Sequence, residues 1–546
     1  MDYKFRNMYC FNNAIRHYLK LDNLYFPKIE FKSDEELRKK VDWSTPFPIY
    51  IKKDYDTEDF RKLKMPNILN FKVCYEYYSQ MDNFFDISKI NNHSRMKVNY
   101  DTGTFKEKSY ENDVDKDLSI LCIKDFLLKM DIKSFYDGIY LHNINKADTI
   151  LGTLNDGCTN GLILGNYLSL FLAENYLTNI AKKLDTAFET QKIDCSFSYF
   201  SDDFFFFVKS KDVKKVEEIF SEILSEIDLH VNSSKTLKLN YLEYNNDNVL
   251  NRYWNKIVNN QNAHIFDWYN TCLSRKVEVK NIRYLYTVFN QLIYRCYQLS
   301  NNKKQNVLVN SFFKSRFWND ELSGYKFSLS NTDVHQIVYL IKEYPECGLY
   351  LIPKLDLSFE KIRDKILSSV YQLFSSSLES KFFERQLYYI YILLKLDSNQ
   401  KLDDLYDRIL MSNNQVLISM LLVYNESFLK WFTRKGIKTR LVDNQNFWFA
   451  NYHVILTYYK KGLTSEKMLS KYICMYLIPL KYHDEAKKLM IEFYYQNIVA
   501  KNPFVASICE ISDSITEYLL QRNHVKNDDV VDENEQDYQE IIDFDF

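Results

Sequence analysis

The sequence predicts an α+β protein in which a small ferredoxin-like sheet precedes a long helical region. Glycine and proline are scarce, at 10 and 8 of 546 residues, which favours long helices over a many-turned all-β fold. Between residues 126 and 240 the patterns run strand, helix, hairpin, helix, strand, which is typical of a ferredoxin-like sheet covered by two helices. From about residue 245 onward apolar residues recur three and four positions apart, as in successive helices.

The first element with a clear pattern is a basic hairpin between residues 50 and 67. Apolar and basic residues alternate on both sides of an acidic loop, and the basic ones are Lys52, Lys53, Arg61 and Lys64. Lys and Arg neutralise phosphate charge, and Arg binds two phosphate oxygens at once, so such a hairpin can grip a triphosphate. An ordinary solvated basic face is the alternative interpretation.

A buried strand is predicted from Phe126 to Ile132, because this run is short and almost continuously apolar. A helix over 68–80 and a polar loop over 92–116 are expected before it. Asp131 lies at the C-terminal end of the strand, and a carboxylate in an apolar strand requires a partner. The alternative is a helix cap, since a helix can start at Ser134.

A glycine-rich segment follows this strand. Gly161 and Gly165 bracket three apolar residues and lead into a helix predicted from Tyr167 to Leu177. Glycine allows close approach of the backbone to a ligand and backbone angles that other residues avoid. The segment lacks the Gly-Lys-Ser/Thr of a Walker-type phosphate loop.

The stretch from Ser198 to Phe207 is aromatic on both sides of a Ser-Asp-Asp interruption. Aromatic residues favour strands, so we expect a strand, a tight turn and a second strand, with Asp202 and Asp203 at the tip. Two neighbouring anions beside an apolar hairpin are unfavourable unless cations meet them, and a pair of divalent metal ions would do so. The alternative is an exposed turn that happens to be rich in aspartate.

The rest of the chain is predicted to be mainly helical. Apolar residues from Val213 to Ile227 have helical spacing, and a strand and turn containing Lys235 are expected over 229–236. The last 19 residues hold nine Asp or Glu and neither Lys nor Arg, as in a disordered tail. The predicted domains are therefore a mixed α/β domain over 1–245, a helical, HEAT-like domain over 246–527 and a disordered acidic tail over 528–546.

Composition and charge narrow the class of protein. The net charge is −2, so any contact with nucleic acid must come from a local basic groove. Ten cysteines without a C-x-x-C pair are typical of a reducing compartment, and the nine histidines show no zinc-ligand spacing. The first residues contain no apolar run, and the longest apolar stretches are too short to cross a membrane. We expect a soluble, cytoplasmic protein with no membrane partner.

Five stretches, in this order, resemble the fingers and palm of reverse transcriptases. The basic hairpin before Met65-Pro66-Asn67 resembles the fingers pattern. Asp131–Tyr136 resembles motif A, and Gly161–Gly165 resembles the glycine-rich motif B. Phe200–Asp203 resembles motif C, the aromatic-x-Asp-Asp signature, and Asn232–Thr236 resembles motif D. The resemblance covers about residues 50 to 240 and implies a palm built on the ferredoxin-like sheet.

Within that superfamily the chain resembles the AbiK-like abortive-infection polymerases of bacterial phage defence. The similar segments are Arg61–Tyr78, Ile139–Ile144 and Gly161–Asn166, and that group also carries a long helical domain after the palm. The resemblance implies a polymerase that adds dNTPs without a template, uses a protein tyrosine as primer and assembles into homo-oligomers. The single-stranded DNA product would be covalently attached to the protein, and its synthesis would block phage growth after a phage-encoded trigger.

The resemblance also implies nucleotidyl transfer with two Mg²⁺ ions, or with Mn²⁺ in their place. Asp131 and Asp202 would bridge the two ions, and Asp203 would support the metal site. Tyr136 would lie under the sugar, exclude a 2′-hydroxyl and favour dNTPs. Lys235 would protonate the leaving pyrophosphate or orient the triphosphate. The remaining nucleotide-binding residues would be Lys52 or Lys53, Arg61, Lys64, Gly161 and Gly165.

The chain departs from the family pattern in motif B, and other functions stay open. Leu164 replaces the polar residue often found there, which disfavours ordinary templated synthesis. No local motif identifies a priming tyrosine, and an N-terminal one such as Tyr9 is one choice among 44. The alternatives are an RNA-templated reverse transcriptase with an associated non-coding RNA, a non-catalytic nucleic-acid-binding sensor with a helical interaction domain, and a nuclease toxin in the helical domain. The intact aspartates argue against the sensor, and the lack of a clustered His and acid pair argues against the toxin.

Overall fold

The computed structural model describes most of the chain. The described residues are 5–29, 36, 39–52, 59–80, 91–96, 98–99, 104–105, 109–144, 150–246, 248, 309, 313, 318, 326–327, 329–434, 441, 445–478 and 484–517. The predicted acidic tail over 528–546, Lys53 and the first part of the predicted helical domain lie outside these residues.

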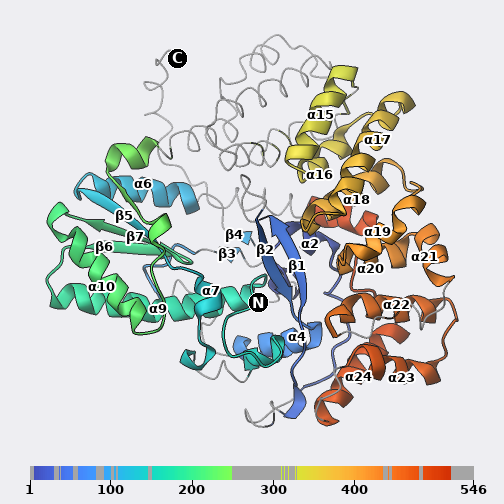
Figure 1. Ribbon diagram of the computed structural model, residues 1–546, viewed down its shortest axis with the longest axis horizontal. Coiled ribbons are helices and arrows are strands. Elements are labelled where there is room, and N and C mark those ends of the chain that lie inside the picture. Colours follow the sequence, from blue (N-terminus) through green and yellow to red (C-terminus); the bar gives the residue numbers. More distant parts are fainter. Residues whose placement is uncertain are drawn as a thin grey trace.

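The protein is a mixed α/β structure with small antiparallel sheets and a helical C-terminal region (Figure 1). A four-stranded sheet and its helices lie on one side, the helical region lies on the other, and a two-stranded hairpin stands between them. The elements up to residue 239 are α1 (Phe5–Tyr9), α2 (Asn13–Tyr18), β1 (Phe47–Lys52), β2 (Phe60–Met65), α4 (Ile68–Ser79), β3 (Val98–Asn99), β4 (Thr104–Phe105), α6 (Ser109–Leu121), β5 (Phe126–Asp131), α7 (Phe135–Gly138), α9 (Tyr167–Thr190), β6 (Ser196–Phe200), β7 (Asp203–Val208), α10 (Val213–Ser225) and β8 (Leu237–Leu239).

The four-stranded sheet has the order β6-β7-β5-β8, and every neighbouring pair is antiparallel. With α9 after β5 and α10 after β7, the connectivity is β-α-β-β-α-β, as the order of the sequence patterns predicts. Met130 on β5 and Phe204 and Phe206 on β7 are buried against these helices, with Phe220 of α10 centred 4.8 and 5.1 Å from the two β7 rings. Burying each such side chain is worth about 1.5–3 kcal/mol.

The last strand of the sheet lies later in the chain than expected. The predicted strand and turn over 229–236 contain a single bridge, from Val231 to Ile132, and a 3₁₀ turn over Ser233–Lys235. The regular strand β8 follows that turn and pairs with β5. The regular strand was therefore predicted too early in the chain, because residues 233–235 form a turn beside the end of β5 and do not pair with it.

The other face of the sheet is partly covered by α6. Val114, Leu118 and Leu121 occur at helical spacing, are buried, and pack in one cluster with Leu127 and Phe207 of the sheet. The expected polar loop over 92–116 was wrong from Ser109 onward, and it also contains the short paired strands β3 and β4. A helix forms there because its sparse apolar residues lie on one face and meet the sheet.

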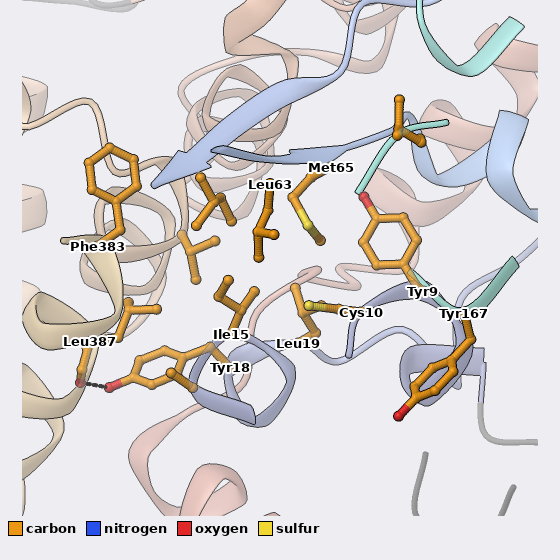
Figure 2. Packing of buried hydrophobic residues seen from close by; sticks show 14 of the residues in the cluster. Tyr9, Cys10, Ile15, Tyr18, Leu19, Leu63, Met65, Tyr167, Phe383 and Leu387 are labelled. Atoms are coloured by element: carbon orange, nitrogen blue, oxygen red, sulfur yellow. Dashed lines mark hydrogen bonds between the residues drawn. The ribbon is translucent and has the colours of Figure 1, made fainter. Parts of the chain in front are cut away.

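The hairpin of β1 and β2 confirms the predicted basic hairpin, with Phe47 opposite Met65 and Lys52 opposite Phe60. Figure 2 shows the core beneath it, in which Leu63 and Met65 point toward the N-terminal helices. Phe383 and Leu387 close the same core from the helical region, and the Tyr18 hydroxyl donates a hydrogen bond to the Leu387 carbonyl. The hairpin is therefore packed on both the N-terminal and the C-terminal parts of the chain.

The helical region is a succession of packed helices, as the apolar spacing predicts. Its elements are α15 (Asn331–Glu343), α16 (Cys347–Leu351), α17 (Glu360–Ser377), α18 (Phe383–Leu396), α19 (Tyr406–Met411), α20 (Gln415–Tyr424), α21 (Glu426–Thr433), α22 (Trp448–Lys460), α23 (Glu466–Tyr476) and α24 (Asp484–Val499). The N-terminal segment pairs with its last part, since the Lys20 amide donates to the Phe504 carbonyl and the Ala506 amide to the Tyr18 carbonyl, both at 2.9 Å. Among the described residues, no helix has the length and apolar character needed to cross a membrane.

Candidate active site

Three carboxylates meet at one end of the four-stranded sheet. β6 ends at Phe200 and β7 begins at Asp203, so the connection is the two-residue turn Ser201-Asp202, as the sequence predicts. Asp203 lies directly opposite Asp131 of β5, and the Ile132 amide donates to the Asp202 carbonyl at 3.0 Å. The sheet register therefore brings Asp131, Asp202 and Asp203 together from two distant parts of the chain.

Asp131 is buried and fully engaged by the segment that follows α10. Only 4% of its surface is exposed. Its carboxyl group accepts hydrogen bonds from the Asn232 side-chain amide at 2.8 Å and from the Lys235 ammonium at 3.1 Å. The Asn232 backbone amide also donates to the Asp131 carbonyl at 2.7 Å. Lys235, whose side chain is 63% exposed, supplies the positive charge that a buried carboxylate requires.

The other two carboxylates differ in their surroundings. Asp203 is paired with Lys129, two residues before Asp131 on β5, at 3.1 Å. Burial raises the pKa of Asp202, and the charges of Asp131 and Asp203 raise it further. The repulsion among the three carboxyl groups therefore acts on Asp202 and favours its protonated form.

The three carboxyl groups are chemically suitable ligands for a divalent cation, but their side chains are not arranged around a common point. Mg²⁺ prefers carboxylate oxygens, and a cation beside Asp202 would relieve the repulsion that raises its pKa. Within the described part of the chain, however, no three His, Cys, Asp or Glu side chains converge as they would around a bound metal ion. Lys235 and Lys129 hold two of the carboxylates, so a cation would have to displace these ammonium groups.

Tyr136 lies beside the aspartate turn. It belongs to α7, which follows Asp131 after the three residues Ile132, Lys133 and Ser134. Burial is the main cause that raises the pKa of its hydroxyl, and the charge of Asp202 adds to it, whereas a hydrogen bond with the Ser201 side chain and the charge of Arg61 act in the opposite direction. Tyr136 therefore connects the turn with the basic hairpin.

The glycine-rich segment joins α7 to the basic hairpin. Gly161 has φ +83°, and a Cβ there would lie 3.3 Å from Asp137 Cα, so another residue would be both strained and crowded. The next amide, of Leu162, donates to the Tyr136 carbonyl at 2.8 Å. At the other end the Lys64 amide donates to the Leu164 carbonyl at 2.9 Å. These bonds fix the distance between Tyr136 and strand β2.

The described cations of the hairpin have different surroundings. The charge of Arg61 acts to lower the pKa of the Tyr136 hydroxyl. The Lys64 ammonium donates to Asn155 Oδ1 at 2.9 Å, and the Lys52 backbone amide donates to Glu384 Oε1 at 3.3 Å. Lys53 lies outside the described residues.

Two features of the site were missed from sequence. Lys129 alternates with Asp131 along β5, a period-two signal that could have identified it. The segment 91–96 adds a parallel edge to β6, because the Tyr199 amide donates to the His93 carbonyl and the Arg95 amide to the Tyr199 carbonyl. No local pattern marks that polar segment as part of the sheet.

Tyr9, one choice for a priming residue, is completely buried beneath the hairpin (Figure 2). Its hydroxyl donates to the Pro66 carbonyl at 2.6 Å, and burial raises its pKa well above the usual range. A nucleotide cannot reach this hydroxyl without opening the core.

Comparison with known proteins does not assign the chain to a family. No protein-family model and no curated protein matches it. Apo telomerase from Candida tropicalis aligns over 75% of this chain and 70% of that chain, with 11% identity and a TM-score of 0.29. Telomerase with a TWJ fragment of telomeric RNA aligns likewise, from Candida albicans (12% identity, TM-score 0.27, 74% and 65% covered) and from Candida tropicalis (13%, 0.29, 72% and 64%). At these TM-scores the likeness carries no argument about function.

Proposed function

We propose that the protein is a nucleotidyltransferase, a DNA polymerase of the reverse transcriptase type. The observation that carries the proposal is the sheet register, which sets Asp203 opposite Asp131 and puts Asp202 in the adjoining turn, beside Tyr136. The charges of Asp131 and Asp203 raise the pKa of Asp202, and a bound cation would offset that repulsion. Two bound Mg²⁺ ions would supply activation of the attacking hydroxyl and neutralisation of the triphosphate charge.

Each residue of the site has a defined role in this proposal. Asp131 and Asp202 would hold the cations, and Asp203 would support them from the facing strand. Arg61 would bind phosphate oxygens of the incoming nucleotide from the side of the hairpin. Lys235, whose ammonium lies 3.1 Å from Asp131, would donate a proton to the leaving pyrophosphate.

In this proposal Tyr136 selects deoxyribonucleotides over ribonucleotides. Its hydroxyl is hydrogen-bonded to the Ser201 side chain and its backbone carbonyl accepts from the Leu162 amide, so the ring would stand beside the turn where the sugar would lie. A rigid ring excludes a 2′-hydroxyl, which favours deoxynucleotides.

The wider role in the proposal follows the resemblance of the motifs to abortive-infection polymerases. DNA synthesis would be template-independent and primed on a tyrosine. The active form would be a homo-oligomer that a phage-encoded trigger activates, and the synthesis would block phage growth. Leu164, which stands where templated enzymes use a polar residue, supports untemplated synthesis. The buried Tyr9 is not a suitable primer, so the priming hydroxyl is expected on an exposed tyrosine.

A single assay tests the proposal. The purified protein is incubated with Mg²⁺ and each labelled dNTP without template or primer, and the products are separated on a denaturing gel before and after protease and nuclease. We expect label that stays with the protein and is released as DNA by protease. Asp202→Asn should abolish it, and Asp228→Asn, at an exposed aspartate after α10 whose φ of 58° suits asparagine, should not.

Other results would replace the proposal. Label that appears only with added RNA would indicate a templated reverse transcriptase. Unchanged incorporation in Asp202→Asn would remove this site from the reaction. No label under any condition would show that the carboxylate cluster is not a polymerase site.

A further inference from the structure

The two faces of the hairpin of β1 and β2 differ in character. Side chains alternate between the faces of a strand, and residues paired across an antiparallel ladder share a face. One face covers the core of Figure 2 with four buried apolar residues, Phe47, Ile49, Leu63 and Met65. The register places six residues on the other, outer face, in three facing pairs: Pro48 with Lys64, Tyr50 with Lys62 and Lys52 with Phe60. None of these six residues is buried.

All the charged side chains of this outer face are positive. They are Lys52, Lys62 and Lys64, whereas Arg61 alternates with them and shares the face of Leu63. The Lys64 ammonium donates to the neutral side chain of Asn155 at 2.9 Å. The acids of the hairpin belong by sequence to the connection between the strands, over 53–59, and not to the paired residues. The outer face is therefore complementary to a polyanion.

Two aromatic rings lie among these lysines. The rings of Tyr50 and Phe60 are nearly perpendicular, with centroids 5.1 Å apart, and 42% of Phe60 is exposed. The ammonium of Lys381, an exposed residue before α18, lies 4.7 Å from the centre of the Phe60 ring and 5.7 Å from that of Tyr50. A cation over an exposed ring is held more weakly than a base stacked on it, so a base can displace this ammonium, which then meets a phosphate.

We propose that the outer face of the hairpin binds single-stranded DNA: Phe60 stacks on a base, and Lys62, Lys64 and Lys381 neutralise the neighbouring phosphates. Aromatic rings between cations suit a flexible single strand, because every base has a π face and every phosphate a charge. A duplex keeps its bases stacked on one another and offers this ring no base to stack on. The choice of DNA rests on the proposed function, whose product is single-stranded DNA, but the binding needs neither that activity nor a divalent cation.

Binding of the full chain to a fluorescent oligothymidylate of about 20 nucleotides, longer than the usual site on a single-strand-binding domain, is measured by anisotropy. The buffer contains EDTA and no dNTP, and the salt concentration is varied. Phe60→Leu keeps an apolar side chain but removes the ring, so it should weaken binding about tenfold, whereas Phe60→Tyr should bind as the wild type does. Lys62→Gln should lower the slope of log K against log salt by about 0.7, which corresponds to one phosphate contact. The matched control is Lys214→Gln, at an exposed lysine of α10, which should leave the slope unchanged.

Lys62→Gln decides the matter if Phe60→Leu does not fold. The inference is overturned if the wild type does not bind the single strand at low salt, if a duplex of the same length binds as tightly, or if both variants bind as Lys214→Gln does. Tighter binding of oligouridylate would overturn the assignment to DNA. Incorporation of dNTP without this binding would refute the inference alone, whereas this binding in a protein that incorporates no dNTP would refute the proposed function alone.

Discussion

Replacing Arg95 tests whether the edge segment 91–96 is a structural part of the four-stranded sheet. Arg95 makes a two-fold ion pair with Asp117 of α6, with N–O distances of 2.6 and 2.9 Å, and the two side chains are only 9% and 2% exposed. The guanidinium also lies 3.9 Å from the centre of the Phe205 ring, and its Nε donates to the Ser198 hydroxyl at 2.8 Å. One side chain thus connects the edge segment, β6, β7 and α6.

Arg95→Met should lower the free energy of unfolding of this sheet by about 3–5 kcal/mol. The cost is large because the Asp117 carboxyl group stays buried after the loss of its cationic partner, while the Tyr244 hydroxyl still donates to it at 2.6 Å. Asp117→Asn removes that charge and keeps an acceptor for Tyr244. The double variant should therefore cost about 1–3 kcal/mol less than the sum of the two single variants.

The measurement is native-state hydrogen exchange of the β6 and β7 amides across a urea series, which reports on the sheet and not on the helical region. The control is Lys183→Met, which removes an ion pair of the same 2.6 Å length to Glu226 whose side chains are 47% and 59% exposed. That change should cost less than about 1 kcal/mol. If Arg95→Met costs no more than this control, or if the two single changes simply add, the account of a buried, coupled pair is refuted.

Three further predictions concern single residues. Buried His453 accepts from the Phe504 amide and donates to the Phe449 carbonyl, and burial lowers its pKa to about 3. Below about pH 6.5 the unfolded chain binds a proton at this residue and the native ring does not, so the free energy of unfolding should fall between pH 6.5 and 3 by up to about 1.4 kcal/mol per pH unit. Urea titrations at several pH values should show a smaller dependence on pH in His453→Gln. Gly161→Ala should lower the free energy of unfolding more than Gly462→Ala does. Both glycines have positive φ (+83° and +68°), which costs alanine about 1–2 kcal/mol, but only at Gly161 would the added Cβ meet other atoms within 4 Å. Equal losses of stability would show that crowding at Gly161 is absent. Tyr9→Phe should lose about 1–2 kcal/mol of stability with unchanged protein-linked label, whereas loss of the label would make Tyr9 the primer.

The elements that the sequence predicts well are those whose pattern is local. The run from Phe126 to Asp131 reads as a buried strand because each residue meets an apolar surface or a neighbouring strand, and the structure confirms it. The Ser201-Asp202 turn is predicted equally well, since the polar residues interrupt two aromatic strands at the point where the chain must reverse. Apolar runs and the polar residues that interrupt them can be recognised in the sequence without knowing which residues they contact in the fold.

What the sequence does not predict depends on partners far along the chain. The edge segment 91–96 is polar and becomes part of the sheet through Asp117 and Tyr199, which lie outside any local window. The pairing with β5 is interrupted between the Val231 bridge and β8, because a 3₁₀ turn over Ser233–Lys235 lies there and the Asn232 and Lys235 side chains bind the Asp131 carboxyl group.

The basic hairpin also connects the helical region to the carboxylates. At its tip, the Lys52 amide donates to Glu384 of α18, and the Tyr50 ring packs at 5.6 Å against that of Phe383. At its base, the Lys64 amide donates to the Leu164 carbonyl in the glycine-rich segment, whose other end is bonded to Tyr136. Both attachments lie on one short hairpin of paired strands, so the hairpin contacts α18 at one end and the glycine-rich segment at the other.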